Sequence, residues 1–118
     1  MVQMPSLATS KWVLSFMNNL FEAEKKLRLH GDPGNVMRNV NKMNDFFKES
    51  GLAYEDPSGQ SFKETRTDLE ATISGTGTDN LVVVEVIKPI IRGDVGGFQR
   101  IIQKGIVVVQ AATDGVSE

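Results

Sequence analysis

The feature that most constrains the fold is a change in side-chain periodicity near Gly51. Before it, apolar residues recur at steps of three and four, as on one face of a helix. After it, runs of Val, Ile and Thr alternate with Gly-rich turns, as in strands. This division predicts a segregated α+β fold: a helical part at residues 1–51, a small and mostly antiparallel β domain at 52–112, and a flexible tail at 113–118.

Two helices are expected in the first part. Thr9 or Ser10 can cap the first helix, and Gly31 ends it. Asp32 and Pro33 can start the second, because a proline at the first helical position loses no hydrogen bond. The apolar residues are Val13, Phe16, Met17, Leu20, Phe21, Ala23 and Leu27 in the first helix, and Val36, Met37, Val40, Met43, Phe46 and Phe47 in the second.

The short connection predicts an antiparallel helical hairpin whose apolar faces are wider than one neighbouring helix can cover. Two arrangements stay open. Either the β half folds over the hairpin, or two chains pair their hairpins in a dimeric four-helix bundle, which would also account for exposed Trp12 and Phe16. The residues expected at that dimer interface are Val13, Phe16, Met17, Leu20, Val36, Val40, Met43 and Phe47.

The second half predicts short strands separated by turns. Turn residues stand at 56–59 and 75–80, and Pro89 ends the strand before it or confines that strand to a sheet edge. The Gly-rich segment 92–97 is expected to be a flexible loop. The expected strands are 52–55, 67–74, 81–87 and 98–110, the last interrupted at 103–105.

Charge and composition limit the partners. With 118 residues and a net charge of −2, the chain lacks the excess of Lys and Arg that drives binding to nucleic acid, so no nucleic-acid partner is expected. The longest apolar run falls far short of the roughly 20 residues that span a bilayer, and the N-terminus shows no secretory pattern. We therefore expect a cytoplasmic protein with no membrane partner.

The chemical motifs predict no enzyme. The absence of Cys removes thiolate nucleophiles and Cys-based metal sites, and the single His30 stands at a helix end. The pair Glu22 and Glu24 has the pattern of solvated surface, so neither a metal nor another cofactor is expected. The least favoured alternative is a small enzyme or ligand-binding domain with a pocket between the halves, which would use Asp68, Glu70 or Arg100.

Several segments resemble, in chain order, those of one known family. Residues 12–23 and 36–52 are similar to its successive helices, and residues 56–62 resemble its turn into a β domain. Residues 81–89 and 100–109 look like its last two long strands. The family is GrpE, whose members are nucleotide exchange factors of DnaK-type chaperones, and this chain resembles a shortened form.

The resemblance implies a homodimer whose β domain inserts into the nucleotide-binding domain of a DnaK-type chaperone and promotes ADP release. It places the chaperone contact at Arg100, Val109 and Val86, and Arg100 is the best candidate because strand valines usually belong to the core. The segment 92–99 is longer than the family's corresponding turn. The alternative is a homodimeric structural or adaptor protein whose β domain binds a different protein and has no exchange activity.

Overall fold

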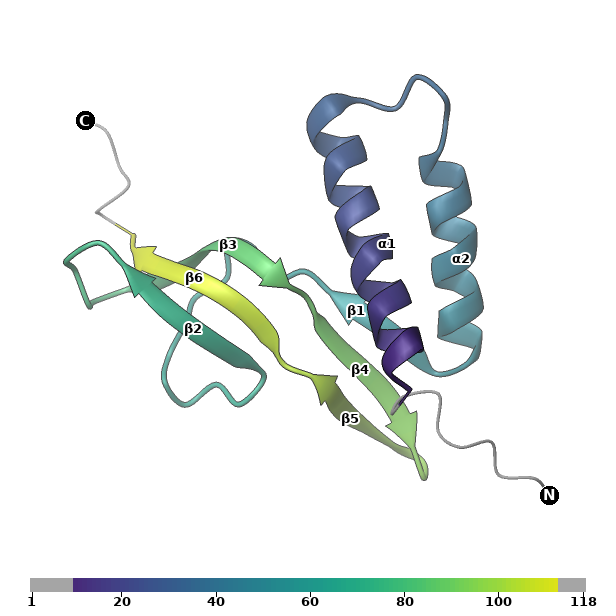
Figure 1. Ribbon diagram of the computed structural model, residues 1–118. Helices are drawn as coiled ribbons and strands as arrows, with labels where there is room; N and C mark the ends of the chain where they lie inside the picture. Colours follow the sequence, from purple (N-terminus) through teal and green to yellow (C-terminus); the bar gives the residue numbers. More distant parts are fainter. Residues whose placement is uncertain (1–9, 113–118) are drawn as a thin grey trace. The chain divides into compact units, whose positions relative to one another are not determined.

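The computed structural model describes residues 10–112 and has the α+β composition that the sequence predicts (Figure 1). Two helices come first, α1 (Lys11–His30) and α2 (Met37–Glu49). The strands form two three-stranded sheets, with the orders β1-β4-β5 and β2-β6-β3. The strands are β1 (Leu52–Glu55), β2 (Leu69–Ser74), β3 (Leu81–Lys88), β4 (Ile90–Val95), β5 (Phe98–Gln103) and β6 (Gly105–Ala111).

The chain forms two compact units that do not coincide with the predicted division at residue 51. The first unit joins residues 10–54 with Ile91–Ile102, so that both helices belong with β1, β4 and β5. The second unit contains β2, β3 and β6. Local periodicity could not reveal this grouping, because β4 and β5 have strand-like sequences although they pack with the helices.

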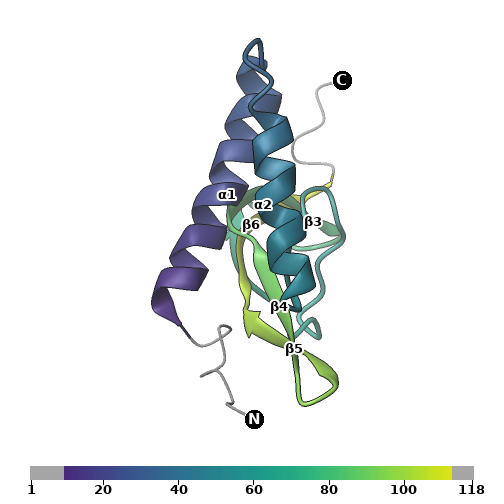
Figure 2. The same ribbon diagram turned by 90° about the vertical axis from the view of Figure 1, so that its right-hand side faces the viewer.

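The helices lie side by side and antiparallel, as Figures 1 and 2 show. The first ends as predicted, with Gly31 at a φ of 92° and its N–H bonded to the Leu27 carbonyl. The second begins later than predicted. The Asp32 carboxylate accepts hydrogen bonds from the backbone N–H groups of Val36 (2.6 Å) and Met37 (2.8 Å), so it caps the helix across a turn that contains Pro33.

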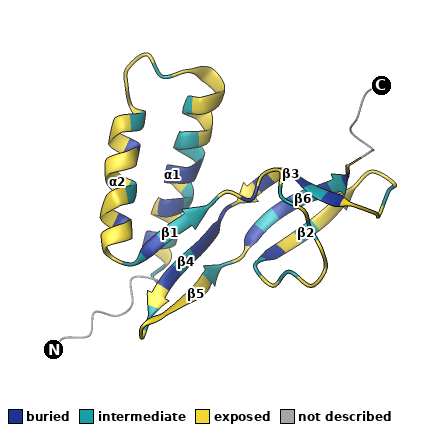
Figure 3. Cartoon of the chain, turned by 180° about the vertical axis from the view of Figure 1, so that it is seen from behind, coloured by how far each residue is buried: buried dark blue, intermediate teal, exposed yellow. Residues whose placement is uncertain are grey.

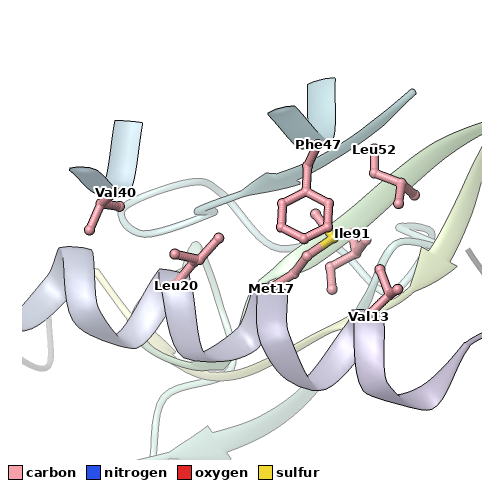
Figure 4. Close-up of a cluster of buried hydrophobic side chains, with 7 residues drawn as sticks. All are labelled: Val13, Met17, Leu20, Val40, Phe47, Leu52 and Ile91. Atoms are coloured by element: carbon pink, nitrogen blue, oxygen red, sulfur yellow. The ribbon is translucent and has the colours of Figure 1, made fainter. Parts of the chain in front are cut away.

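The core of the first unit brings both helices together with β1 and β4. In Figure 4 its side chains point toward one another from all four elements. Ile91 is fully buried in it, which explains why this part of the chain groups with the helices. Removing an aliphatic side chain of this size from water contributes about 1.5–3 kcal/mol. The cluster consists of Val13, Met17, Leu20, Val40, Phe47, Leu52 and Ile91.

The sheet of the second unit is mixed, and its parallel pair is a feature that the sequence did not predict. Its central strand β6 pairs antiparallel with β3 but parallel with β2, with Leu69 opposite Gly105. A parallel pair needs a long connection, and here the chain between β2 and β6 supplies it. Residues alternate between buried and half-buried along β6, as the period of a strand requires.

The segment 92–97 is not the flexible loop that the sequence predicts. The strand β4 runs through it to Val95, and only Gly96 and Gly97 turn the chain, at φ values of 61° and 85°. A two-residue hairpin turn of this kind requires positive φ, which glycine adopts without strain. The strand itself is fixed by the burial of Ile90 and Ile91. The break predicted at Pro89 is confirmed, because it separates β3 from β4.

Candidate functional site

A group of large apolar side chains stays exposed on the helices, and we call it the hairpin patch: Trp12, Phe16, Met43 and Phe46. Their exposed fractions are 64%, 42%, 36% and 63%. The α1 members are four residues apart and the α2 members three, the spacings at which side chains are neighbours on a helix surface. The patch therefore combines aromatic and methionine side chains from both helices.

A groove of about 530 Å³ lies within the hairpin patch. Its floor includes the buried ring of Phe47, which meets the rings of Phe16 and Phe46 edge to face, at centroid distances of 5.6 and 5.8 Å. Of the described residues in the lining, Lys42 alone is charged. A second hollow, of about 460 Å³, shares Trp12, Phe16 and Met43 with the first. Such a groove can bind apolar side chains of a partner.

The exposure of the patch follows from the width of the apolar stripes. On α1, Val13 and Met17 fill the core, and Trp12 and Phe16 stand one position before them. Since adjacent helical residues are about 100° apart, a neighbour of a core residue faces a different direction. The stripes contain more apolar side chains than the core of this unit takes in.

A polar cluster on the same unit joins both helices to β1. The Tyr54 hydroxyl donates to the Glu24 carboxylate, and the Asn44 amide donates to the Tyr54 oxygen at 2.8 Å. The ring of Phe21 lies edge-on to Tyr54 at 5.8 Å. Burial, followed by the hydrogen bond to Glu24, raises the pKa of Tyr54 above its ordinary value. Glu24, which also pairs with Arg28, is therefore a structural anchor rather than the solvated residue that the sequence predicts.

Arg66 makes a second polar cluster, in the other unit. Its guanidinium makes two hydrogen bonds to the Asp68 carboxylate, at 2.9 and 3.0 Å. It also donates to the Gln60 side chain at 3.0 Å and to the Ser61 carbonyl at 3.1 Å. These contacts fix the connection before β2. Asp68 therefore has a structural partner, and Glu70 is exposed on β2.

The residues predicted for a dimer interface divide into two sets. Those buried within the core of the single chain are Val13, Met17, Leu20, Val40 and Phe47. Those left exposed are Phe16, Val36 and Met43. Trp12 and Phe46 are exposed as well; the dimeric bundle was expected to account for Trp12, but neither was named among the interface residues. Spacing alone does not reveal which rows of a wide apolar stripe face the core.

The residues predicted for a partner contact also divide. Val86 and Val109 are buried in the sheet β2-β6-β3, with exposed fractions of 2% and 0%. Arg100 is exposed on β5, between exposed Phe98 and Ile101. Among residues 10–112, no side chain forms an ion pair with Arg100. Of this set, only Arg100 is open to a partner.

Comparison with protein families, with curated proteins and with solved structures found no match for this chain. The GrpE resemblance therefore stays a prediction. Between residues 10 and 112, no three histidine or acidic side chains are grouped so that they could hold a metal ion. In the same part of the chain, neither helix has the length and apolar character to cross a membrane.

Proposed function

We propose that this protein is a homodimeric adaptor, which assembles through the hairpin patch and presents its strands to another protein. The observation that carries this proposal is the patch itself. Single exposed apolar residues are ordinary on a protein surface, but a contiguous aromatic group marks an interaction site. Aromatic residues and methionine are also the types enriched at protein interfaces.

A second copy of the chain is the occupant that fits the patch best. An interface with twofold symmetry uses the same surface on both copies, so this surface must offer both a projection and a hollow. The patch offers both: Trp12 and Phe46 project, with exposed fractions of 64% and 63%, and the groove lies between the helices that carry them. Two hairpins in contact would form a four-helix arrangement.

Sedimentation velocity over a range of protein concentrations tests this assembly. We expect a dimer at micromolar concentration that dissociates on dilution. Trp12 is the only tryptophan of the chain, so its fluorescence emission should move to longer wavelength as the dimer dissociates. Phe46→Ser should raise the dimer Kd at least about tenfold, since the substitution occurs on both sides of the interface.

Leu29→Ser is the matched control. Leu29 is also an exposed apolar residue of a helix, at 74%, but it does not line the groove. The control should leave the dimer Kd within about twofold of the original, a change smaller than a typical interface contribution. A monomer at all concentrations up to about 100 μM, near the weak end of specific association, would contradict the assembly.

A second candidate function is nucleotide exchange on a DnaK-type chaperone. The exposure of Arg100 favours it, because the GrpE resemblance assigns the best chaperone contact to this residue. In this mechanism the protein must bind the open, nucleotide-free chaperone more tightly than the closed one. The test is the release of fluorescent ADP from a DnaK-type chaperone, which should accelerate with dose and weaken in Arg100→Ala. Unchanged release would remove this candidate and leave the adaptor.

A further inference from the structure

The strand β5 lies at the edge of the sheet β1-β4-β5, and its outer side is the basis of this inference. In the described part of the chain, β5 pairs with β4 alone. Figure 3 shows it as mostly exposed, beside the buried strand β4. Phe98 is 68% exposed and Ile101 is 37% exposed. An edge of this kind has main-chain groups and apolar side chains available to a partner at the same place.

The turn fixes which main-chain groups of β5 point outward. A two-residue turn at 96–97 places Val95 opposite Phe98, and therefore Asp94 opposite Gln99. The Asp94 N–H bonds to the Gly51 carbonyl at 2.9 Å, on the side away from β5. In an antiparallel ladder, two opposite residues that do not hydrogen-bond each other both direct their N–H and C=O groups away from the pair. The N–H and C=O groups of Gln99, and of Ile101 two residues later, therefore face the open side of β5.

The other sheet edges differ from this one. The outer side of β3 is covered at its start, because residues 59–62 make backbone hydrogen bonds to Val83 and Leu81. The strand β1 has only four residues. The strand β2 is also an edge strand with one charge, but that charge, Glu70, has the opposite sign to Arg100, and only Ile73 among its apolar residues is exposed. Natural sheets blunt their edges by covering, shortening or charging them. No strand between residues 10 and 112 covers the outer side of β5, which contains no proline and one charge.

We propose that the outer edge of β5 binds an extended segment of another protein, which adds to the sheet as a strand and places an acidic residue beside Arg100. The backbone groups of Gln99 and Ile101 define the class of ligand, since only another extended backbone matches their spacing. This inference rests on the proposed adaptor function for its biological meaning, but it does not require the dimer. The site lies within one protomer.

Charge identifies the segment as acidic and argues against a second copy of β5. Arg100 is the only charged residue of β5, and it stands in the middle of the exposed stretch. Pairing two copies of β5 would bring two such guanidinium groups to one seam with no acid in either strand. Like charges across a strand pair are destabilising, whereas a carboxylate beside Arg100 is favourable. An apolar residue two positions from that carboxylate would lie on the face of Phe98, and one next to it would lie on the opposite face, beside Ile101.

The test uses a short capped peptide in which valine and threonine alternate around a central glutamate, and a second peptide with lysine in place of glutamate. Binding is followed by amide chemical shifts of the full-length, isotope-labelled protein. We expect the glutamate peptide to bind with a Kd below about 1 mM and to shift the amide signals of Gln99 and Ile101 most. The lysine peptide should bind about fivefold more weakly, as expected for a reversed cross-strand charge.

Two variants separate the backbone contact from the charge contact. Arg100→Glu should reverse the preference, so that the lysine peptide binds more tightly than the glutamate peptide. Gln99→Pro removes an outward N–H without removing a bond to β4, and should abolish binding of both peptides. Glu70→Lys is the matched control, because it makes a charge reversal on an exposed edge strand of the other sheet. It should leave both affinities unchanged.

Two results would overturn the proposal: no shifts at peptide concentrations up to several times 1 mM, or binding whose charge preference is unchanged in Arg100→Glu. Failure of the dimer is recognised separately. Phe46→Ser should still bind the glutamate peptide as a monomer, whereas Arg100→Glu should sediment as a dimer. A peptide that binds only to the dimer would contradict a site contained within one protomer.

Discussion

Replacing Tyr54 with phenylalanine tests whether the polar cluster holds the helices to β1. The substitution removes the hydroxyl, which donates to Glu24 and accepts from Asn44, and retains the ring that contacts Phe21. A hydrogen bond to a charged group contributes about 1.5–3 kcal/mol. Since the cluster is only partly buried, we expect the free energy of unfolding to fall by about 2 kcal/mol.

The assay is urea denaturation followed by far-ultraviolet circular dichroism, at one fixed protein concentration. A double-mutant cycle with Glu24→Gln assigns the loss to the pair, because the variants should be non-additive by about 1 kcal/mol or more. Glu22→Gln is the matched control: it makes the same chemical change on the same helix, at a residue outside the cluster, and should change stability by less than about 0.5 kcal/mol.

A loss below about 0.5 kcal/mol for Tyr54→Phe would refute the reasoning, since that is the range of ordinary surface substitutions. Additive effects of the Tyr54 and Glu24 variants would refute it as well. In either case the Tyr54 hydroxyl would gain no more from Glu24 and Asn44 in the folded protein than from water in the unfolded chain. The attachment of β1 to the helices would then depend on the apolar core alone.

Three further predictions concern pH and packing. The pKa of Tyr54 is higher in the folded than in the unfolded state, so the stabilisation by its hydroxyl is complete below the unfolded pKa of about 10 and declines as the pH rises above it. Urea unfolding between about pH 8 and 11 should therefore show a steeper decline in the free energy of unfolding for the original protein than for Tyr54→Phe. Gly105→Ala, whose Cβ would lie 2.8 Å from a Leu69 methyl group, should lower the free energy of unfolding by about 1–3 kcal/mol, whereas Gly34→Ala, with its nearest contact at 3.7 Å, should not. Ile91→Ala should cost about 2–5 kcal/mol by the same assay, because the side chain is fully buried in the core of the first unit.

The helices were the most predictable part of the fold, because their signals are local. Apolar spacing identified both, and Gly31 ends α1 where the sequence places its end. The start of α2 was less accessible. An aspartate before a proline is a typical helix start, but here the Asp32 side chain reaches over a turn to the N–H groups of residues 36 and 37. That geometry depends on the path of the turn, which residue types alone do not specify.

The strands show the limit of local patterns more clearly. Pro89 ends β3 as predicted, because a proline acts on its own backbone, and the interruption predicted at 103–105 is confined to Lys104. The grouping of β4 with the helices depends instead on where Ile91 is buried. The parallel pairing of β2 with β6 depends on a contact between segments far apart in the chain. Neither relation changes the pattern of apolar and polar residues within the strand, so the sequence pattern cannot predict it.

The sequence indicated the apolar surface of the candidate site but not which residues of it stay exposed, for a related reason. The wide apolar stripes correctly indicated surplus apolar surface. Residues in the row that faces the core, such as Met17, are buried, and Trp12 and Phe46 remain exposed. A sequence gives the width of a stripe and not the direction from which a neighbouring strand covers it. Here β1 and β4 provide core residues, and these decide which row stays free.

One cause accounts for both exposed surfaces of the first unit. The sheet β1-β4-β5 is buried mainly through its central strand, where Ile90 and Ile91 have no exposed surface. The edge strand β5 contributes Ile102 to the margin of the core and leaves Phe98 and Ile101 outside, while the helices leave the hairpin patch outside. Because the two surfaces share no residue, dimerisation and strand addition should respond to separate substitutions. A variant that lost both through one side-chain change, while remaining folded, would show that they are a single site.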